Sequence, residues 1–126
     1  MSLALALHHD GPPLDFAAEA PTGRITALVG PSGSGKTSIL RAIAGLLRLK
    51  RARIAFDGDV WDDERTHRAT RDRPIGLVPQ GYALFPHMTV QGNVETALLH
   101  LDPTLRRQRA RECIALAHVA GLEQRR

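Results

Sequence analysis

The sequence predicts an α/β protein, and three observations support this prediction. Short apolar runs at residues 25–29 and 75–78 are typical of buried parallel strands. Residues 36–47 carry apolar side chains at helical spacing, which indicates an amphipathic helix. A glycine-rich segment at residues 30–35 joins the first apolar run to that helix. The expected core is therefore a parallel sheet with flanking helices.

An antiparallel flank is expected beside this core, because several short segments alternate between apolar and polar residues. The predicted strands are residues 2–7, 14–18, 53–56 and 59–61. The first two can pair, since only a turn-rich segment separates them. Asp57-Gly58 lies between the last two, and this dipeptide is typical of a tight hairpin turn.

The rest of the chain is expected to be helical, first at residues 90–101. Asp102-Pro103 indicates a second helix start, since Asp caps a first turn and Pro suits the first helical position. The apolar face of this second helix comprises Ala110, Cys113, Ile114, Ala117 and Ala120, and Gly121 can end it. We therefore divide the chain into a core with its β flank, residues 1–89, and the start of a helical subdomain, residues 90–126.

Composition narrows the possible functions. The chain has 126 residues and a net charge of +4. Its arginines are spread out without interleaved aromatic residues, so no nucleic-acid partner is expected. The single cysteine, Cys113, excludes an intrachain disulfide bond. No apolar stretch approaches the ~18 residues that a membrane span requires.

Residues 30–37 match the pattern Gly-x-x-x-x-Gly-Lys-Thr between a predicted strand and a predicted helix. This is the context of the phosphate-binding loop of P-loop nucleoside triphosphatases, whose glycines let backbone amides surround phosphate groups. Lys36 can reach the terminal phosphates, and the Thr37 hydroxyl can bind Mg²⁺. The expected ligands are ATP and Mg²⁺. The predicted nucleotide-binding residues are Gly30, Pro31, Ser32, Gly33, Ser34, Gly35, Lys36, Thr37 and Ser38.

A second segment narrows the family. Residues 78–90 (VPQGYALFPHMTV), followed by Asn93-Val94, closely resemble the glutamine-loop region of ABC transporter ATPases. Residues 39–47 and 54–58 are similar to the helix and hairpin that follow the family's phosphate loop. The resemblance runs from about residue 25 to residue 126 and is strongest to importers, in particular to the ATPase subunits of molybdate uptake systems. Importers of sulfate, iron, sugars and polyamines share part of it.

The resemblance implies roles for several residues. Gln80 would contact Mg²⁺ and the attacking water, so Gln80 and Lys36 are the expected catalytic residues. Tyr82, Leu84, Phe85 and Pro86 would line a groove for a helix of a membrane subunit; a small core cluster is the alternative. The implied protein pairs with a second nucleotide-binding domain on the cytoplasmic face of the plasma membrane and imports a solute such as molybdate. Its expected enzyme class is a transport ATPase.

The sequence departs from the family pattern in several places. It contains no Leu-Ser-Gly-Gly-Gln signature, no strand ending in Asp-Glu (the second Walker motif) and no later switch histidine. We therefore interpret it as the N-terminal portion of a nucleotide-binding domain that binds ATP but hydrolyses it poorly. The usual adenine-stacking aromatic residue is also missing, and His8, His9 or Phe16 are the candidates for its role. A non-catalytic ATP-binding module and a small-molecule kinase are the alternative functions.

Overall fold

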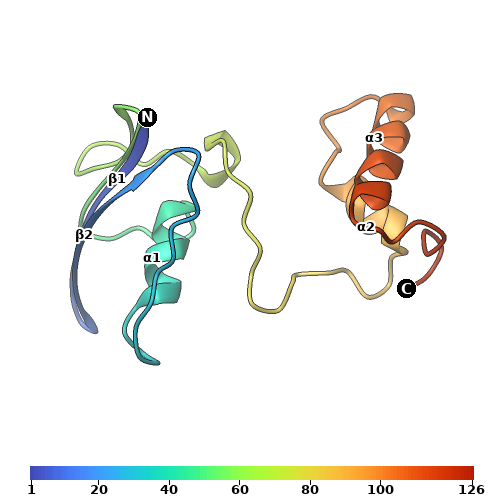
Figure 1. Cartoon of the computed structure of the whole chain (residues 1–126). Coiled ribbons are helices and arrows are strands. Elements are labelled where there is room, and N and C mark those ends of the chain that lie inside the picture. Colours follow the sequence, from blue (N-terminus) through green and yellow to red (C-terminus); the bar gives the residue numbers. More distant parts are fainter. The chain divides into compact units, whose positions relative to one another are not determined.

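The computed structural model describes residues 1–126, which form two compact units, Met1–Leu77 and Val78–Arg126 (Figure 1). The first unit holds the sheet and α1, and the second holds α2 and α3. None of the helices is both long and apolar enough to cross a membrane. Each unit has buried apolar side chains of its own.

The sheet of the first unit has four antiparallel strands in the order β2-β1-β3-β4. The strands are β1 (Ser2–Asp10), β2 (Pro13–Pro21), β3 (Arg51–Phe56) and β4 (Asp59–Asp62). Leu5 at the centre of β1 faces Ala18 of β2 on one side and Ile54 of β3 on the other. The predicted pairing of the first two strands and the predicted hairpin are therefore confirmed.

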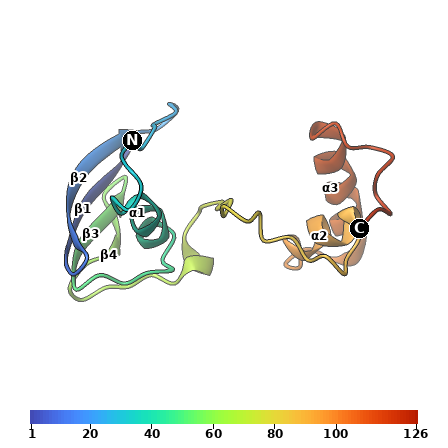
Figure 2. The same cartoon turned by 90° about the horizontal axis from the view of Figure 1, so that it is seen from below.

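The helix α1 (Lys36–Ile43) packs on one face of this sheet (Figure 2). The alternation of β1 places Leu5 and Leu7 in the core, where they pack with Ile39 and Ala42 of α1. Leu49, Ile54 and Trp61 complete the buried cluster. Burial of these side chains holds α1 to the sheet, because a helix this short is not stable alone.

Tight turns at glycines determine where two of these elements end. In the β3–β4 hairpin, Asp57 and Gly58 both have positive φ, 50° and 83°, as a type I′ turn requires. At the end of α1, Gly45 has φ 78° and donates to Ala42 O, while Leu46 donates to Arg41 O. This pair of hydrogen bonds is a Schellman motif. It ends α1 at Ile43, four residues before the predicted end at 47.

The α/β class is confirmed, but the predicted parallel strands are wrong. Residues 25–29 and 75–78 form no strand, and Ile25, Val29 and Val78 are 102%, 87% and 80% exposed. The apolar runs suit a buried strand, yet a parallel pair gains hydrogen bonds only when segments distant in sequence meet. The sheet is instead built from antiparallel neighbours, two pairs of which are joined by short turns.

The second unit consists of α2 (Val90–Thr96) packed on α3 (Pro103–Leu116). The predicted start of α3 is confirmed, since Asp102 accepts hydrogen bonds from Thr104 N and Leu105 N. Ala110 and Ile114 are buried. The rest of the predicted apolar face, Cys113, Ala117 and Ala120, is exposed, because the short α2 covers only a narrow stripe of α3.

Candidate phosphate-binding site

The glycine-rich loop precedes α1 in a tightly turned conformation. Gly33 and Gly35 have φ values of 79° and 89°, a region that side-chain-bearing residues adopt only with strain. Ser34 N donates to Pro31 O across the turn at 3.3 Å. At Gly30, an added Cβ would lie 2.9 Å from Ser34 Oγ. The positive φ values of Gly33 and Gly35 are therefore the reason that this loop needs glycine.

Lys36 places its ammonium group directly over this loop. Its Nζ donates to Gly30 O at 2.7 Å and to Pro31 O at 2.6 Å, and it lies 3.4 Å from Ser34 Oγ. Carbonyl oxygens are neutral acceptors, whereas phosphate oxygens are charged and form stronger hydrogen bonds with an ammonium group. The ammonium can therefore exchange these carbonyl contacts for a phosphate without leaving the loop.

The N-terminus of α1 adds backbone donors to the same place. Gly35 is the N-cap residue and supplies no side-chain cap. The first intrahelical hydrogen bond runs from Ile39 N to Gly35 O at 2.9 Å. The N–H groups of Lys36, Thr37 and Ser38 precede it and have no partner within the helix. Together with the helix dipole they form a site suited to an anion.

The residues present also fit a magnesium ion beside such an anion. Thr37 is exposed at the second position of α1, directly after Lys36 in the chain. A hydroxyl oxygen is the hard ligand that Mg²⁺ accepts, and Mg²⁺ is usually held by few protein ligands together with phosphate oxygens. Thr37 therefore supplies one hydroxyl ligand suited to a Mg²⁺ ion that also contacts phosphate oxygens.

A cavity of about 150 Å³ adjoins the loop. It is lined by Gly33, Gly35 and Ser38 and by His9 of β1 and Leu14 of β2. Leu47 and Leu49 also line this cavity, a role that the sequence did not reveal because the apolar pattern placed Leu47 in the helix. Of the three candidates for base stacking, His9 lines this cavity, whereas Phe16 packs against the core.

Gln80 belongs to the second unit, where it is exposed in a turn closed by Tyr82 N donating to Pro79 O at 2.9 Å. The side chains that follow are exposed: Tyr82 is 72%, Leu84 69% and Phe85 43% accessible. The interpretation of these residues as a core cluster is therefore wrong. Pro86 is exposed with them.

Asn93 is a residue whose contribution the sequence did not reveal. Its Oδ1 accepts from Phe85 N at 2.8 Å, and its Nδ2 donates to Phe85 O and Thr89 O, both at 3.1 Å. An amide can pair with a backbone N–H and C=O at once. Asn93 therefore fixes the exposed apolar loop to α2. This contact could not be predicted from the sequence, because no spacing rule relates a helical asparagine to a preceding loop.

Comparison with known proteins places this geometry in a family. Residues 15–126 match the sequence profile of the ABC transporter family. The chain is 41% identical over 108 residues to the molybdenum import ATP-binding protein ModC of Methylococcus capsulatus, covering 84% of this chain. It is 39% identical over 117 residues to the sulfate/thiosulfate import ATP-binding protein CysA 1 of Agrobacterium fabrum, covering 88% of this chain.

The fold has a counterpart among solved structures. The dimeric structure of MJ0796, a bacterial ABC transporter cassette, matches 97% of this chain with a TM-score of 0.76 and 25% sequence identity. The chain covers 60% of that cassette, and it spans 30% of the Methylococcus relative and 33% of the Agrobacterium relative. Because the family profile, the relatives and the fold agree over most of its length, the chain belongs to the ABC transporter family.

Proposed function

We propose that this chain binds Mg-ATP through residues 30–38 and supplies the nucleotide site of an import ATPase. The observation that carries the proposal is the Lys36 ammonium over the loop, at the N-terminus of α1 that no side chain caps. The loop amides and Lys36 would hold the phosphates, and Thr37 would hold Mg²⁺, which neutralises phosphate charge when bound. His9 lines the adjoining cavity and is our candidate for the nucleoside contact.

The transported solute is proposed from the relatives. The names of several relatives specify molybdenum import, while others specify sulfate/thiosulfate or Fe(3+) import. Molybdate and sulfate are both tetrahedral oxyanions, so we propose an oxyanion importer, with molybdate as the first candidate. ATP binding and hydrolysis in the transport protein would drive uptake.

The exposed loop of the second unit supports a contact with a membrane subunit. Tyr82, Leu84, Phe85 and Pro86 present an apolar surface next to Gln80. Tyr82 and Ala83 have φ values of 59° and 53°, a costly conformation for residues other than glycine. Such strain is concentrated at functional segments. We propose that Gln80 senses nucleotide and that this loop docks a membrane subunit at the cytoplasmic face of the plasma membrane.

A second nucleotide-binding domain is the other proposed partner. The solved cassette that matches the fold is described as dimeric. In the proposed transporter, ATP would bring two such domains together.

The test of nucleotide binding is calorimetric titration of the 126-residue chain with Mg-ATP. We expect saturable binding by the unmodified chain and its loss in Lys36→Ala, with Mg-AMP binding weakly to both because AMP lacks the terminal phosphates. Arg41→Ala, an exposed change on the same helix, is the matched control and should leave the affinity unchanged. Equal affinity of the Lys36→Ala chain and the unmodified chain would rule out the proposed site.

Binding and turnover are separate outcomes. Because the sequence contains no second Walker motif, we expect the 126-residue chain to bind Mg-ATP and release little phosphate. This is the non-catalytic binding alternative, and phosphate release above the Lys36→Ala background would contradict it. Transfer of phosphate to an added small acceptor would instead favour a kinase.

A further inference from the structure

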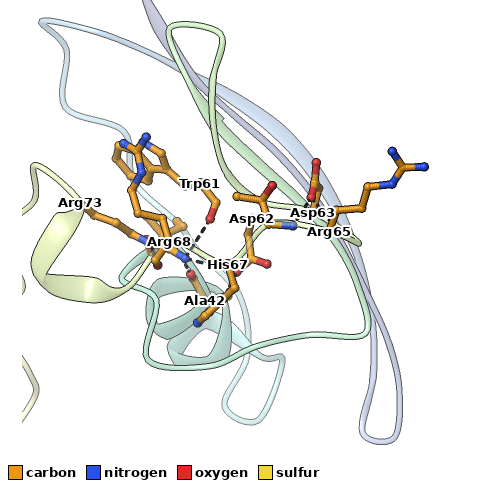
Figure 3. A network of polar contacts seen from close by, with 10 residues as sticks. Ala42, Trp61, Asp62, Asp63, Arg65, His67, Arg68 and Arg73 are labelled. Carbon is orange, nitrogen blue, oxygen red and sulfur yellow. Dashed lines mark hydrogen bonds and ion pairs between the residues drawn. The ribbon is translucent and has the colours of Figure 1, made fainter.

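A buried arginine joins α1 to the segments that follow it in the chain. The Arg73 side chain is 0% exposed, and all three of its nitrogens contact protein oxygens (Figure 3). Its Nη1 donates to Ala42 O at 2.9 Å and to Ile43 O at 2.7 Å, the last carbonyls of α1. Its Nε donates to Arg68 O at 2.9 Å. One guanidinium group therefore ties the C-terminal end of α1 to the segment after β4.

The charge of Arg73 is balanced within the same network. Its Nη2 lies 3.3 Å from Asp62 Oδ2, and the Asp62 side chain is 1% exposed. His67 Nδ1 lies 2.8 Å from that same oxygen, and the Trp61 ring lies 5.8 Å from Arg73 Cζ. The planar fork of five donors makes this set of contacts specific to arginine, since lysine presents a single ammonium group.

Apolar burial holds α1 to the sheet, and Arg73 adds hydrogen bonds to the carbonyls at its C-terminal end. Only Ile39 and Ala42 of its eight residues are buried, and its N-terminal end is the loop that no side chain caps. A cation is also the favourable charge at a helix C-terminus. Gly45 makes room for the contact: an added Cβ there would lie 2.9 Å from Arg73 Nε. Arg73 and Gly45 therefore both contribute to this contact at the end of α1.

We propose that Arg73 is a positioning residue for the phosphate-binding site. By holding the C-terminal carbonyls of α1, it sets the orientation of the helix and thereby of the amides and the Lys36 ammonium at the other end. The inference rests on the proposed binding of nucleotide phosphates by that loop. Arg73 itself does not line the loop or its cavity.

The decisive variant is Arg73→Lys, which keeps the charge and removes the fork. The control is Phe56→Leu, because the Phe56 ring stacks on Trp61 at a centroid distance of 5.5 Å and supplies no hydrogen bond to α1. Both changes should lower the melting temperature. Each chain is titrated with Mg-ATP at a temperature at which circular dichroism shows it to be folded, and backbone amide NMR spectra are recorded without nucleotide.

For Arg73→Lys we expect about tenfold weaker Mg-ATP binding, corresponding to about 1.4 kcal/mol, and shifted amide resonances at Gly33, Gly35 and Lys36. Phe56→Leu should retain the affinity and the loop resonances of the unmodified chain. Unchanged affinity in Arg73→Lys, or an equal loss in both variants, would overturn the proposal, because the effect would then be absent or merely structural.

Two further outcomes remain decisive. If the unmodified chain does not bind Mg-ATP, the proposed function fails, and the loop resonances alone decide whether Arg73 positions the loop. If Arg73→Lys does not fold, Gly45→Ala takes its place, since it crowds Arg73 Nε and leaves the arginine present. Loop resonances that stay unchanged in the substitute variant would count against the inference.

Discussion

Gly35 and Gly76 differ in what a methyl group would meet. At Gly35 the φ of 89° disfavours any side chain, and an added Cβ would lie 3.1 Å from Leu14 Cδ1. At Gly76 the space is open and φ lies outside the positive region. The same chemical change therefore tests the backbone conformation of the phosphate loop at one position and very little at the other.

We predict that Gly35→Ala lowers the free energy of unfolding by about 1–2 kcal/mol through backbone strain and weakens Mg-ATP binding. Gly76→Ala should change stability by about 0.5 kcal/mol or less and leave binding intact. Urea unfolding followed by circular dichroism, together with calorimetric titration, measures both effects. Equal behaviour of the two variants would show that the loop tolerates a side chain at Gly35.

The conformation of the exposed loop depends on the side-chain amide of Asn93. Because its Oδ1 and Nδ2 contact both the N–H and the C=O of Phe85, we predict that Asn93→Ala accelerates hydrogen exchange of the Phe85 amide by at least about tenfold, the equivalent of one lost net hydrogen bond. The control is Gln91→Ala, which removes only the side-chain contact with Glu95. Exchange at Phe85 that is unchanged in Asn93→Ala would contradict the role of Asn93.

At the scale of the element, the start of α3 depends on one carboxylate. Asp102 Oδ1 accepts from Thr104 N at 3.0 Å and from Leu105 N at 3.1 Å, and Pro103 occupies the first helical position. We predict that Asp102→Ala destabilises the helical unit by about 0.5–2 kcal/mol. Asp102→Asn retains an accepting oxygen and should behave like the unmodified chain. Urea unfolding followed by far-UV circular dichroism, which reports helix content, distinguishes the two.

The elements that could be predicted are those that depend on residues close together in the sequence. The antiparallel flank followed from alternation and short turns, and Asp57-Gly58 gave the hairpin its turn. The end of α1 was missed because a helical apolar pattern continues past Gly45, whereas the chain turns there in a Schellman motif. The parallel strands were overpredicted because an apolar run indicates a need for burial and does not specify a partner strand.

At the scale of the whole molecule, four carboxylates respond to pH in the same direction. The pKa of Asp63 is lowered from its ordinary value of 3.8, first by the backbone N–H of Arg65 and then by that of Thr66. A hydrogen bond from His8 lowers the pKa of Asp10, and contacts with Gln108 and Arg109 lower that of Glu112. The N–H of Gly121 lowers the pKa of Glu123.

A carboxyl group with a lowered pKa in the folded state stabilises that state above its unfolded pKa. The contribution is lost as pH falls through the folded pKa. We therefore predict a melting temperature that is steady above about pH 5 and declines below 3.8, the ordinary aspartate value. Asp63→Asn keeps an oxygen that can accept the turn hydrogen bonds, and it should reduce the slope of that decline. An unchanged slope would show that Asp63 does not contribute.

The candidate site was predicted unequally from the sequence. The loop of residues 30–37 was recognised from its motif, which encodes contacts within a few residues, and its nucleotide binding stays a prediction. Arg73 and Asp62 were missed, since they are 11 residues apart in the sequence and carry no periodic signal. Asn93 was missed for a similar reason: its partners lie in a loop whose conformation no spacing rule describes.

Trp61 gives the chain an optical reporter of its own. It is the single tryptophan of the sequence, 2% exposed, and its ring is near both the Phe56 ring and the Arg73 guanidinium group. Indole emission is sensitive to the polarity and charge of its surroundings. The second unit contains no tryptophan. Trp61 fluorescence therefore follows the unfolding of the first unit alone, without an added label.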